Sequence, residues 1–202
     1  MSVKTVKTER TIFGLTGGIA SGKTTAVERF KEHGFFIIDS DKLVDRLWKN
    51  RKFLRKLSAE LGVKLEGPKD KAILSKLIFE SEEARKKVNE LFHPTVFKKI
   101  DKILAKKRKE KRIIIDMPLL LEVGYDEKCD YVILIYSNEY YQIERLMKRN
   151  NLTEEEALKR INAQMPLDEK TEFADVVIDN NYTIEKLYRQ IDHFVRSFYC
   201  EE

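Results

Sequence analysis

A glycine-rich stretch near the start of the chain has the residue types that bind phosphate. Residues 17–24 read Gly-Gly-Ile-Ala-Ser-Gly-Lys-Thr and fit the P-loop pattern G-x-x-x-x-G-K-[ST]. Its glycines allow backbone conformations in which several N–H groups converge on phosphate oxygens at a helix N-terminus. Lys23 adds a mobile positive charge for the β and γ phosphates, and Thr24 adds a hydroxyl for Mg²⁺. The chemistry indicated is binding of a nucleoside triphosphate.

The neighbours of this stretch are those that a P-loop requires. Residues 11–16 (TIFGLT) form a short apolar run rich in β-formers, and residues 24–32 (TTAVERFKE) begin an amphipathic helical pattern. The alternative is a glycine-rich turn that only caps a helix. A strand before the turn and a helix after it favour the nucleotide site.

Composition limits the remaining possibilities. A chain of 202 residues can bury one substantial core, as one domain or a core with small insertions. Charged residues make up 36% of it and the formal net charge is +5, which suits anionic ligands and also permits nucleic-acid binding. The densest basic run, residues 106–112 (KKRKEKR), lies where a helix is expected to end. A solvated helix end is favoured there, and no nucleic-acid partner is expected.

Cysteine usage and the N-terminus point to the cytoplasm. Cys129 and Cys200 are far apart and have no metal-ligand spacing, so free thiols in a reducing compartment are expected. Residues 1–10 are polar and basic with no apolar segment after them, which argues against a secretory signal. No apolar run approaches the length of a membrane span.

The next strand is expected at residues 35–39 (FFIID), after a helix end at His33-Gly34. A strand, helix and strand in this order imply parallel pairing with a right-handed crossover. Asp39 and Asp41 then lie at the carboxyl end of a strand, the edge of an open α/β sheet where ligands bind.

Residues 42–112 show helical periodicity and no convincing strand. About seventy residues of helix exceed what a simple crossover needs. We interpret them as an inserted helical substrate domain. Within it, residues 82–111 are expected to form two helices or one helix interrupted at His93-Pro94, because proline removes an N–H and disfavours helix in the residue before it.

Strand signals return in the second half. Residues 112–116 (RIIID) end on Asp116, and an acid at that place commonly holds the Mg²⁺ shell of P-loop proteins. Residues 131–136 (YVILIY) and 175–179 (DVVID) give a fourth and a fifth strand, and residues 183–199 a closing amphipathic helix.

A lid over the phosphates is expected between the last two strands. Residues 153–156 have the pattern of a capping box at the start of a helix, which should end at Met165-Pro166. Arginines and a glutamine recur one turn apart on the helices of this segment: Arg145, Arg149, Arg160 and Gln164. They can neutralise phosphate charge and exclude water. The alternative is that these are solvated helix charges paired with nearby glutamates.

With these segments in order, the chain resembles the dephospho-coenzyme A kinase family from about residue 12 to residue 191. The residues that carry the resemblance are 15–25 (LTGGIASGKTT), 38–41 (IDSD), His93-Pro94, 116–122 (DMPLLLE), Arg145 with Arg149, Arg160 with Gln164, and the acids and Asn180 around the last strand. It departs from the family pattern at Ala20, where glycine is frequent, at Ser40, where alanine is frequent, and at Lys71, where an arginine is common.

The resemblance implies an α/β fold of the P-loop NTPase type, with three layers (α/β/α), a five-stranded parallel sheet, a helical insert and a lid. The nucleotide core would comprise residues 1–41, 112–138 and 174–202, the helical domain residues 42–111, and the lid residues 139–173. It implies ATP-dependent phosphorylation of the ribose 3′-hydroxyl of dephospho-CoA, giving CoA and ADP. We also expect a monomer, and Mg²⁺ bound together with ATP.

Candidate site residues follow from the motifs and the resemblance together. Catalysis is assigned to Asp41, Lys23 and Arg145, with Asp41 as the base that accepts the hydroxyl proton. ATP binding is assigned to Gly17, Ala20, Ser21, Gly22, Lys23, Thr24, Thr25, Arg145 and Arg149. Substrate binding is assigned to Asp39, Asp41, His93 and Leu119, and the metal to Thr24 and Asp116. Two alternatives stay open: Asp41 as the N-cap of the helix beginning near Lys42, and His93 as a helix stop.

Two other functions fit part of the pattern. A nucleoside monophosphate kinase would share the loop, the strands and the lid, and would differ in its acceptor pocket. A P-loop switch NTPase would need a macromolecular activator, and a GTP-binding one would carry an N-K-x-D motif, which the sequence lacks. Arginines supplied within the chain make an external activator unnecessary.

Overall fold

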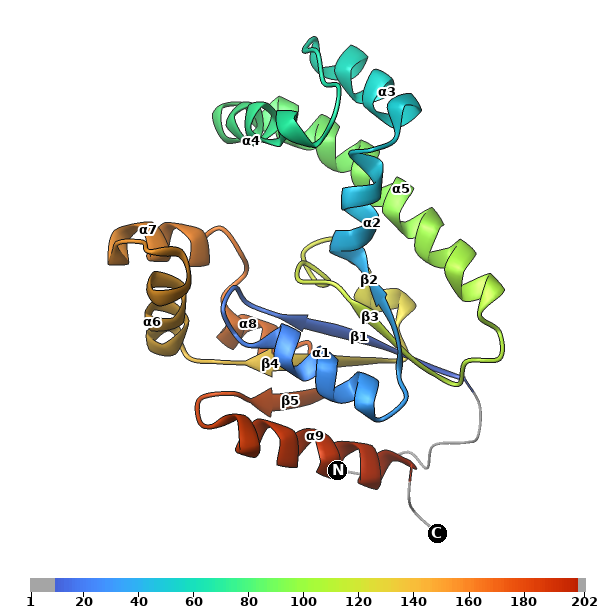
Figure 1. The fold of residues 1–202 in the computed structure, drawn as a ribbon, viewed down its shortest axis with the longest axis vertical. Helices are drawn as coiled ribbons and strands as arrows, with labels where there is room; N and C mark the ends of the chain where they lie inside the picture. The colour runs from blue at the N-terminus through green and yellow to red at the C-terminus, as the bar shows by residue number, and fades with distance from the viewer. Residues whose placement is uncertain (1–9, 200–202) are drawn as a thin grey trace. The chain divides into compact units, whose positions relative to one another are not determined.

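A five-stranded parallel sheet forms the centre of the computed structural model, which describes residues 10–199 (Figure 1). The strands are β1 (Thr11–Gly17), β2 (Phe36–Asp39), β3 (Arg112–Asp116), β4 (Tyr131–Tyr136) and β5 (Val176–Asp179). Their order across the sheet is β2-β3-β1-β4-β5, so β1 lies in the middle with parallel partners on both sides. The predicted α/β class and parallel sheet are confirmed.

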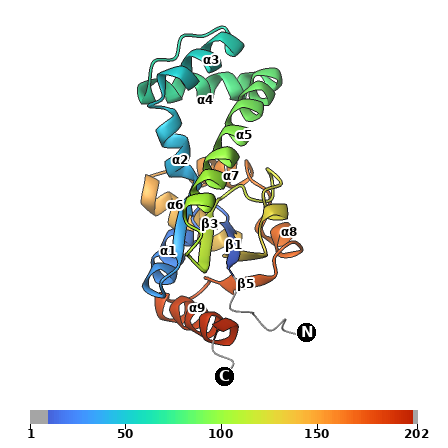
Figure 2. The same cartoon turned by 90° about the vertical axis from the view of Figure 1, so that its right-hand side faces the viewer.

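Helices cover both faces of this sheet (Figure 2). Helix α1 (Lys23–Glu32) and helix α9 (Ile184–Tyr199) pack on one face, and α8 (Leu167–Thr171) packs against β4 on the other. Strands buried on both faces read as continuous apolar runs, which is why Ile113, Ile114 and Ile115 are all fully buried. The core between α1, α9 and the sheet centres on Phe13, whose ring contacts four aromatic neighbours.

Asp39–Arg108 form a compact unit distinct from the sheet unit. Its elements are α2 (Ser40–Leu47), α3 (Arg51–Leu61), the 3₁₀ turn η1 (Pro68–Asp70), α4 (Lys71–Glu80) and α5 (Glu82–Lys106). Helix α5 is the centre of this unit, since α2, α3 and α4 each pack against it.

The expected break at His93-Pro94 is wrong, because α5 continues through Pro94 as a single helix of 25 residues. Proline removes one backbone donor, but Phe92 and Val96, two positions before and after it, are both buried in the unit. The Thr95 hydroxyl also donates to the Leu91 carbonyl at 2.7 Å, so a side-chain bond accompanies the turn that contains the proline. Tertiary packing outweighs the local preference here.

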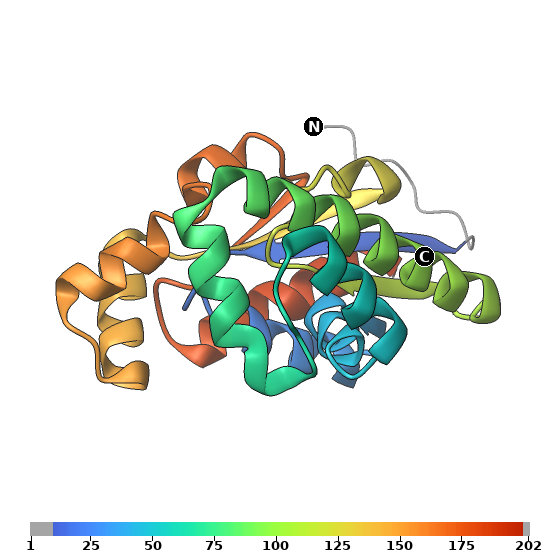
Figure 3. The same cartoon turned by 90° about the horizontal axis from the view of Figure 1, so that it is seen from above.

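Three helices lie between β4 and β5: α6 (Glu139–Asn150), α7 (Glu154–Ile161) and α8. Figure 3 shows α6 and α7 side by side, in agreement with their contacts. The predicted capping box of Thr153 and Glu156 is confirmed. The prediction that this helix carries Gln164 and ends at Met165-Pro166 is wrong. It ends at Ile161, and Pro166 precedes α8, which the sequence reading did not anticipate.

The polar N-terminal segment up to residue 9 and Cys200 lie outside the described residues. Cys129 is a free, half-buried thiol whose burial raises its pKa to about 12, so it is a poor nucleophile at neutral pH. Among residues 10–199, none of the helices combines the length and the apolar character that crossing a membrane requires.

A short 3₁₀ turn, η2 (Asp126–Lys128), precedes β4.

Candidate active site

The glycine-rich loop connects β1 to α1, as the motif requires. Gly22 is the N-cap of α1 with φ 91°, a left-handed conformation that suits glycine. A Cβ at this position would collide with the side-chain nitrogen of Asn180. Asn180 follows β5 and donates from Nδ2 to the Ser21 carbonyl at 2.7 Å. The loop is therefore braced from the carboxyl end of another strand.

Lys23 forms an ion pair with Asp116, the last residue of β3. Because β3 pairs with β1 in the register Leu15 to Asp116, the carboxylate lies beside the end of β1. The two side chains are 14% and 12% exposed, so the pair is largely shielded from water while remaining accessible to a ligand. In a charge pair of this kind, the ammonium can bind an anionic ligand and the carboxylate can bind a cation.

The remaining loop residues differ in what they can present to a ligand. The Thr24 side chain is exposed in the first turn of α1 and can reach a metal. Ser21 is fully buried, and its hydroxyl has no protein partner within residues 10–199. Ala20 has φ 60°, in the left-handed region.

Arg145 reaches the rim of the loop from α6. Its guanidinium donates to the Asn180 carbonyl at 2.7 Å, to the Ser137 hydroxyl at 3.2 Å and to the Ala20 carbonyl at 3.4 Å. Arg149, one turn further along, is exposed and donates instead to the side chain of Asn150 at 2.9 Å. Arg145 thus contacts the loop, whereas the hydrogen bond of Arg149 is to its neighbour on α6.

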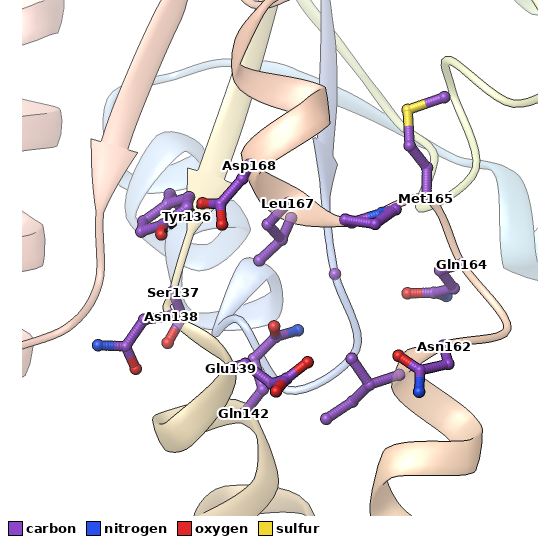
Figure 4. A pocket seen from close by; sticks show the side chains of 13 residues that line it. Tyr136, Ser137, Asn138, Glu139, Gln142, Asn162, Gln164, Met165, Leu167 and Asp168 are labelled. Carbon is purple, nitrogen blue, oxygen red and sulfur yellow. Dashed lines mark hydrogen bonds between the residues drawn. The ribbon is translucent and has the colours of Figure 1, made fainter.

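Two glutamines from the segment between β4 and β5 contact the loop. Gln142 in α6 donates from Nε2 to the Ile19 carbonyl at 2.7 Å, and Gln164 after α7 accepts from the Ile19 N–H at 2.9 Å. A cavity of about 80 Å³ is lined by both glutamines and by Gly18 (Figure 4). In the lining of this cavity, the Tyr136 hydroxyl donates to Asp168 at 2.7 Å.

A buried lysine joins α8 to the loop that follows β3. Lys170 in α8 is completely buried and pairs with Glu122 at 2.8 Å while donating to the Pro118 carbonyl at 3.0 Å. Glu122 also accepts from the Met165 N–H at 3.2 Å. The loop after β3 is thus joined to Met165 and α8 by a buried charge that has hydrogen-bonding partners.

The helical unit contains the other predicted acids and the histidine. Asp39 is the N-cap of α2 and accepts from the Lys42 N–H at 2.9 Å, so Asp41 as N-cap is wrong. Asp41 lies in the first turn with an exposed side chain. His93 is not a helix stop, since it lies inside α5, where its ring stacks on Phe97 and burial lowers its pKa.

Leu119 belongs to the sheet unit, in the turn after β3, and is 41% exposed. An apolar side chain left open beside Asp116 is available to a ligand. The structure thus places the loop, Asp116, Leu119 and Arg145 in one unit, and Asp39, Asp41 and His93 in the other.

Sequence reasoning gave no site role to Gln142, Asn180 or Lys170. Asn180 could have been found, because it directly follows a predicted strand and so lies at the ligand edge. Gln142 carries a weaker signal, one helical turn before Arg145 on the same face. Its bond to a backbone group 123 residues away has no local pattern.

Comparison with known proteins agrees with this geometry. The family described as dephospho-CoA kinase matches residues 11–186. The dephospho-CoA kinase of Fusobacterium nucleatum is 36% identical over 186 residues, covering 91% of this chain and 96% of the relative. A Campylobacter jejuni dephospho-CoA kinase structure superposes with a TM-score of 0.69 at 28% identity, covering 92% of this chain and 96% of that one. The structure of TT1252 from Thermus thermophilus gives a TM-score of 0.80 at 29% identity, covering 94% and 98%. The chain therefore belongs to the dephospho-CoA kinase family and is an ATP-dependent phosphotransferase.

Proposed function

We propose that residues 17–25 hold the triphosphate of ATP while dephospho-CoA is phosphorylated on its ribose 3′-hydroxyl. The observation that carries this proposal is the ion pair of Lys23 with Asp116 at the mouth of the loop. On ATP binding, Lys23 would exchange the carboxylate for the β and γ phosphates. The proposed ATP-binding residues are Gly17, Ala20, Ser21, Gly22, Lys23, Thr24, Thr25, Arg145 and Arg149.

Mg²⁺ fits the residues at this mouth. Thr24 offers a hydroxyl and Asp116 a carboxylate, and Mg²⁺ prefers oxygen ligands of this kind together with waters and substrate phosphates. Among residues 10–199, no group of three or more His, Cys, Asp or Glu side chains is placed to hold a metal ion. When bound, Mg²⁺ would neutralise charge on the phosphates. Asp116, released from Lys23, would hold it directly or through water.

Asp41 is the proposed general base. A ribose hydroxyl is a poor nucleophile at neutral pH, so a carboxylate that orients it and accepts its proton is useful. Asp41 is exposed, and Asp39 already caps the helix, so helix α2 does not need the Asp41 side chain for capping. In the reaction the hydroxyl oxygen bonds to the γ phosphorus, the bond to the β-γ bridging oxygen breaks, the proton passes to Asp41, and ADP leaves.

Four residues are proposed to bind the acceptor. Asp39, His93 and Leu119 are the proposed substrate-binding residues together with Asp41. The His93 ring is predominantly neutral at pH 7, since burial lowers its pKa, so it can accept or donate a hydrogen bond without adding charge. We assign the nucleotide core to residues 1–41, 112–138 and 174–202, the substrate domain to residues 42–111 and the lid to residues 139–173.

We also infer that the protein acts as a monomer in the cytoplasm. Both substrates are small molecules, and the proposed phosphate site is built within one chain. Light scattering on the purified protein tests the monomer, and a dimer whose disruption abolishes turnover would overturn it.

An acceptor panel tests the substrate. Purified protein with ATP and Mg²⁺ is assayed for ADP release with dephospho-CoA, AMP, UMP or dCMP. We expect release with dephospho-CoA and formation of an equal amount of CoA. Faster turnover of a nucleoside monophosphate would show that the alternative kinase activity is the correct one.

A further inference from the structure

Ala20 adopts a backbone conformation that is unfavourable for its residue type. Its φ is 60°, in the left-handed region, where every residue with a Cβ pays a steric cost that glycine does not. Among residues 10–199, the only other non-glycine residue with positive φ is Asn151, a residue type that tolerates this region. The strain at Ala20 lies in the middle of the phosphate loop and needs an opposing interaction.

Gln142 donates a hydrogen bond to the peptide group that precedes this strained position. Its side chain is 96% buried, and its Nε2 donates to the Ile19 carbonyl, which belongs to the peptide that joins Ile19 to Ala20. A Cβ on Gly18 would come within 2.6 Å of that nitrogen, so the glycine leaves the space that Gln142 occupies. The following carbonyl, of Ala20, accepts a weaker bond from Arg145 at 3.4 Å.

The bond to the Ile19 carbonyl also sets the direction of the next N–H. In a planar trans peptide the C=O and the N–H point to opposite sides. Holding the Ile19 carbonyl toward Gln142 therefore directs the Ala20 N–H away from Gln142. Within the part of the chain that the structure describes, that N–H donates to no protein acceptor, which leaves it available to a phosphate oxygen.

We propose that Gln142 is a positioning residue for ATP: its hydrogen bond to the Ile19 carbonyl holds Ala20 in the left-handed conformation and aims the Ala20 N–H at the phosphates. The inference rests on the ATP site proposed for residues 17–25. It gives the lid helix α6 a role in shaping the loop, in addition to the role of Arg145.

Four variants test it: Gln142→Met, Gln142→Glu, Ala20→Gly and the double change of Gln142→Met with Ala20→Gly. Methionine keeps the volume without the donor, and glutamate keeps the shape without the donated hydrogens. Either change at Gln142 should raise the Kd and KM for ATP about tenfold, as expected for one residue losing support in the left-handed region. The KM for dephospho-CoA should stay unchanged. Ala20→Gly in the Gln142→Met background should restore ATP affinity to within about threefold of the wild type, because glycine needs no support there.

Tyr136→Phe is the matched control. It removes a hydrogen bond in the same cavity without touching Ile19 or Ala20, so it should leave the ATP KM unchanged, and Ala20→Gly should add nothing to it. Unaltered ATP binding in both Gln142 variants would overturn the inference, as would loss of ATP binding that Ala20→Gly does not restore. Lys23→Ala distinguishes failure of the ATP site from failure of the positioning role. If Lys23→Ala binds ATP normally, the proposed ATP site is wrong. If Lys23→Ala binds ATP poorly and the Gln142 variants bind it normally, only the positioning role of Gln142 is wrong.

Discussion

At the scale of single residues, the site is defined by charges whose present partners a nucleotide can replace. Lys23 and Asp116 neutralise each other at the end of β1 and β3. Desolvated, unpaired charges in this position would be costly, so the pair stabilises the protein before the substrates arrive. The same two groups then have the charges that triphosphate and Mg²⁺ require. While no ligand is bound, the ion pair keeps both side chains charged at the mouth of the loop.

Asp41→Asn tests the proposed base. Asparagine keeps the size and the hydrogen-bonding shape but cannot take the hydroxyl proton, so kcat should fall by about 10² to 10⁴ with ATP binding preserved. Single-turnover kinetics and calorimetric titration with ATP measure the two effects. Asp45→Asn is the matched control on the same helix, where it removes only an exposed pair with Lys71. A doubled KM with normal kcat would exclude Asp41 as the base.

At the scale of elements, helix α6 connects the segment between β4 and β5 to the glycine-rich loop. It delivers Gln142 to the Ile19 carbonyl and Arg145 to the rim formed by Ser137 and Asn180. A helix whose first turn is bonded to the glycine-rich loop should respond to movement of that loop, since any such movement changes the bonds.

Arg145→Ala tests the lid arginine. We expect kcat to fall by about 10²-fold and the ATP Kd to change much less, because the guanidinium should act mainly on charge that develops during transfer. Arg145→Lys should recover part of the rate, as it restores the charge without the planar fork. Equal losses in binding and in kcat/KM, with kcat unchanged, would show that Arg145 only holds the ground state.

At the scale of the whole molecule, Asp192 connects the first helix to the last. It accepts two hydrogen bonds from Arg29, both at 2.7 Å, and lies 2.7 Å from Nε2 of His33, joining α9 to α1 over the common core. Hydrogen bonds from Arg29 in particular lower the pKa of Asp192 to about 2. Because the folded pKa lies below the value of the unfolded chain, the charged pair stabilises the fold above about pH 4, and this contribution is lost as pH falls toward 2.

Asp192→Asn should therefore lower the free energy of unfolding by about 1 kcal/mol at pH 7, after allowance for partial solvent screening. The difference from wild type should shrink steadily between pH 4 and pH 2, where the wild-type carboxylate takes up its proton. Urea unfolding at a series of pH values measures both. A difference that is independent of pH across this range would mean that the carboxylate's charge is not what joins the helices.

Much of this architecture can be predicted from the sequence, for physical reasons. Strands buried on both faces show as apolar runs, so residues 112–116 and 131–136 are found with their observed ends. Pro94 misleads because the local cost of a proline is small beside the packing of Phe92 and Val96. The lid glutamines escape prediction because their partners are backbone groups of a distant loop, which leave no periodic signal.

The most direct measurement is the amount of ADP and CoA formed from ATP and dephospho-CoA in a fixed initial interval. It compares the wild type with Lys23→Ala and Lys31→Ala. Lys31→Ala is the matched control, since it removes an exposed α1 pair with Glu28 that lies outside the loop. We expect equimolar ADP and CoA with wild type and Lys31→Ala, and a loss of at least about 10²-fold in both products with Lys23→Ala. Near-normal yields from Lys23→Ala, or ADP formed without CoA, would contradict the account.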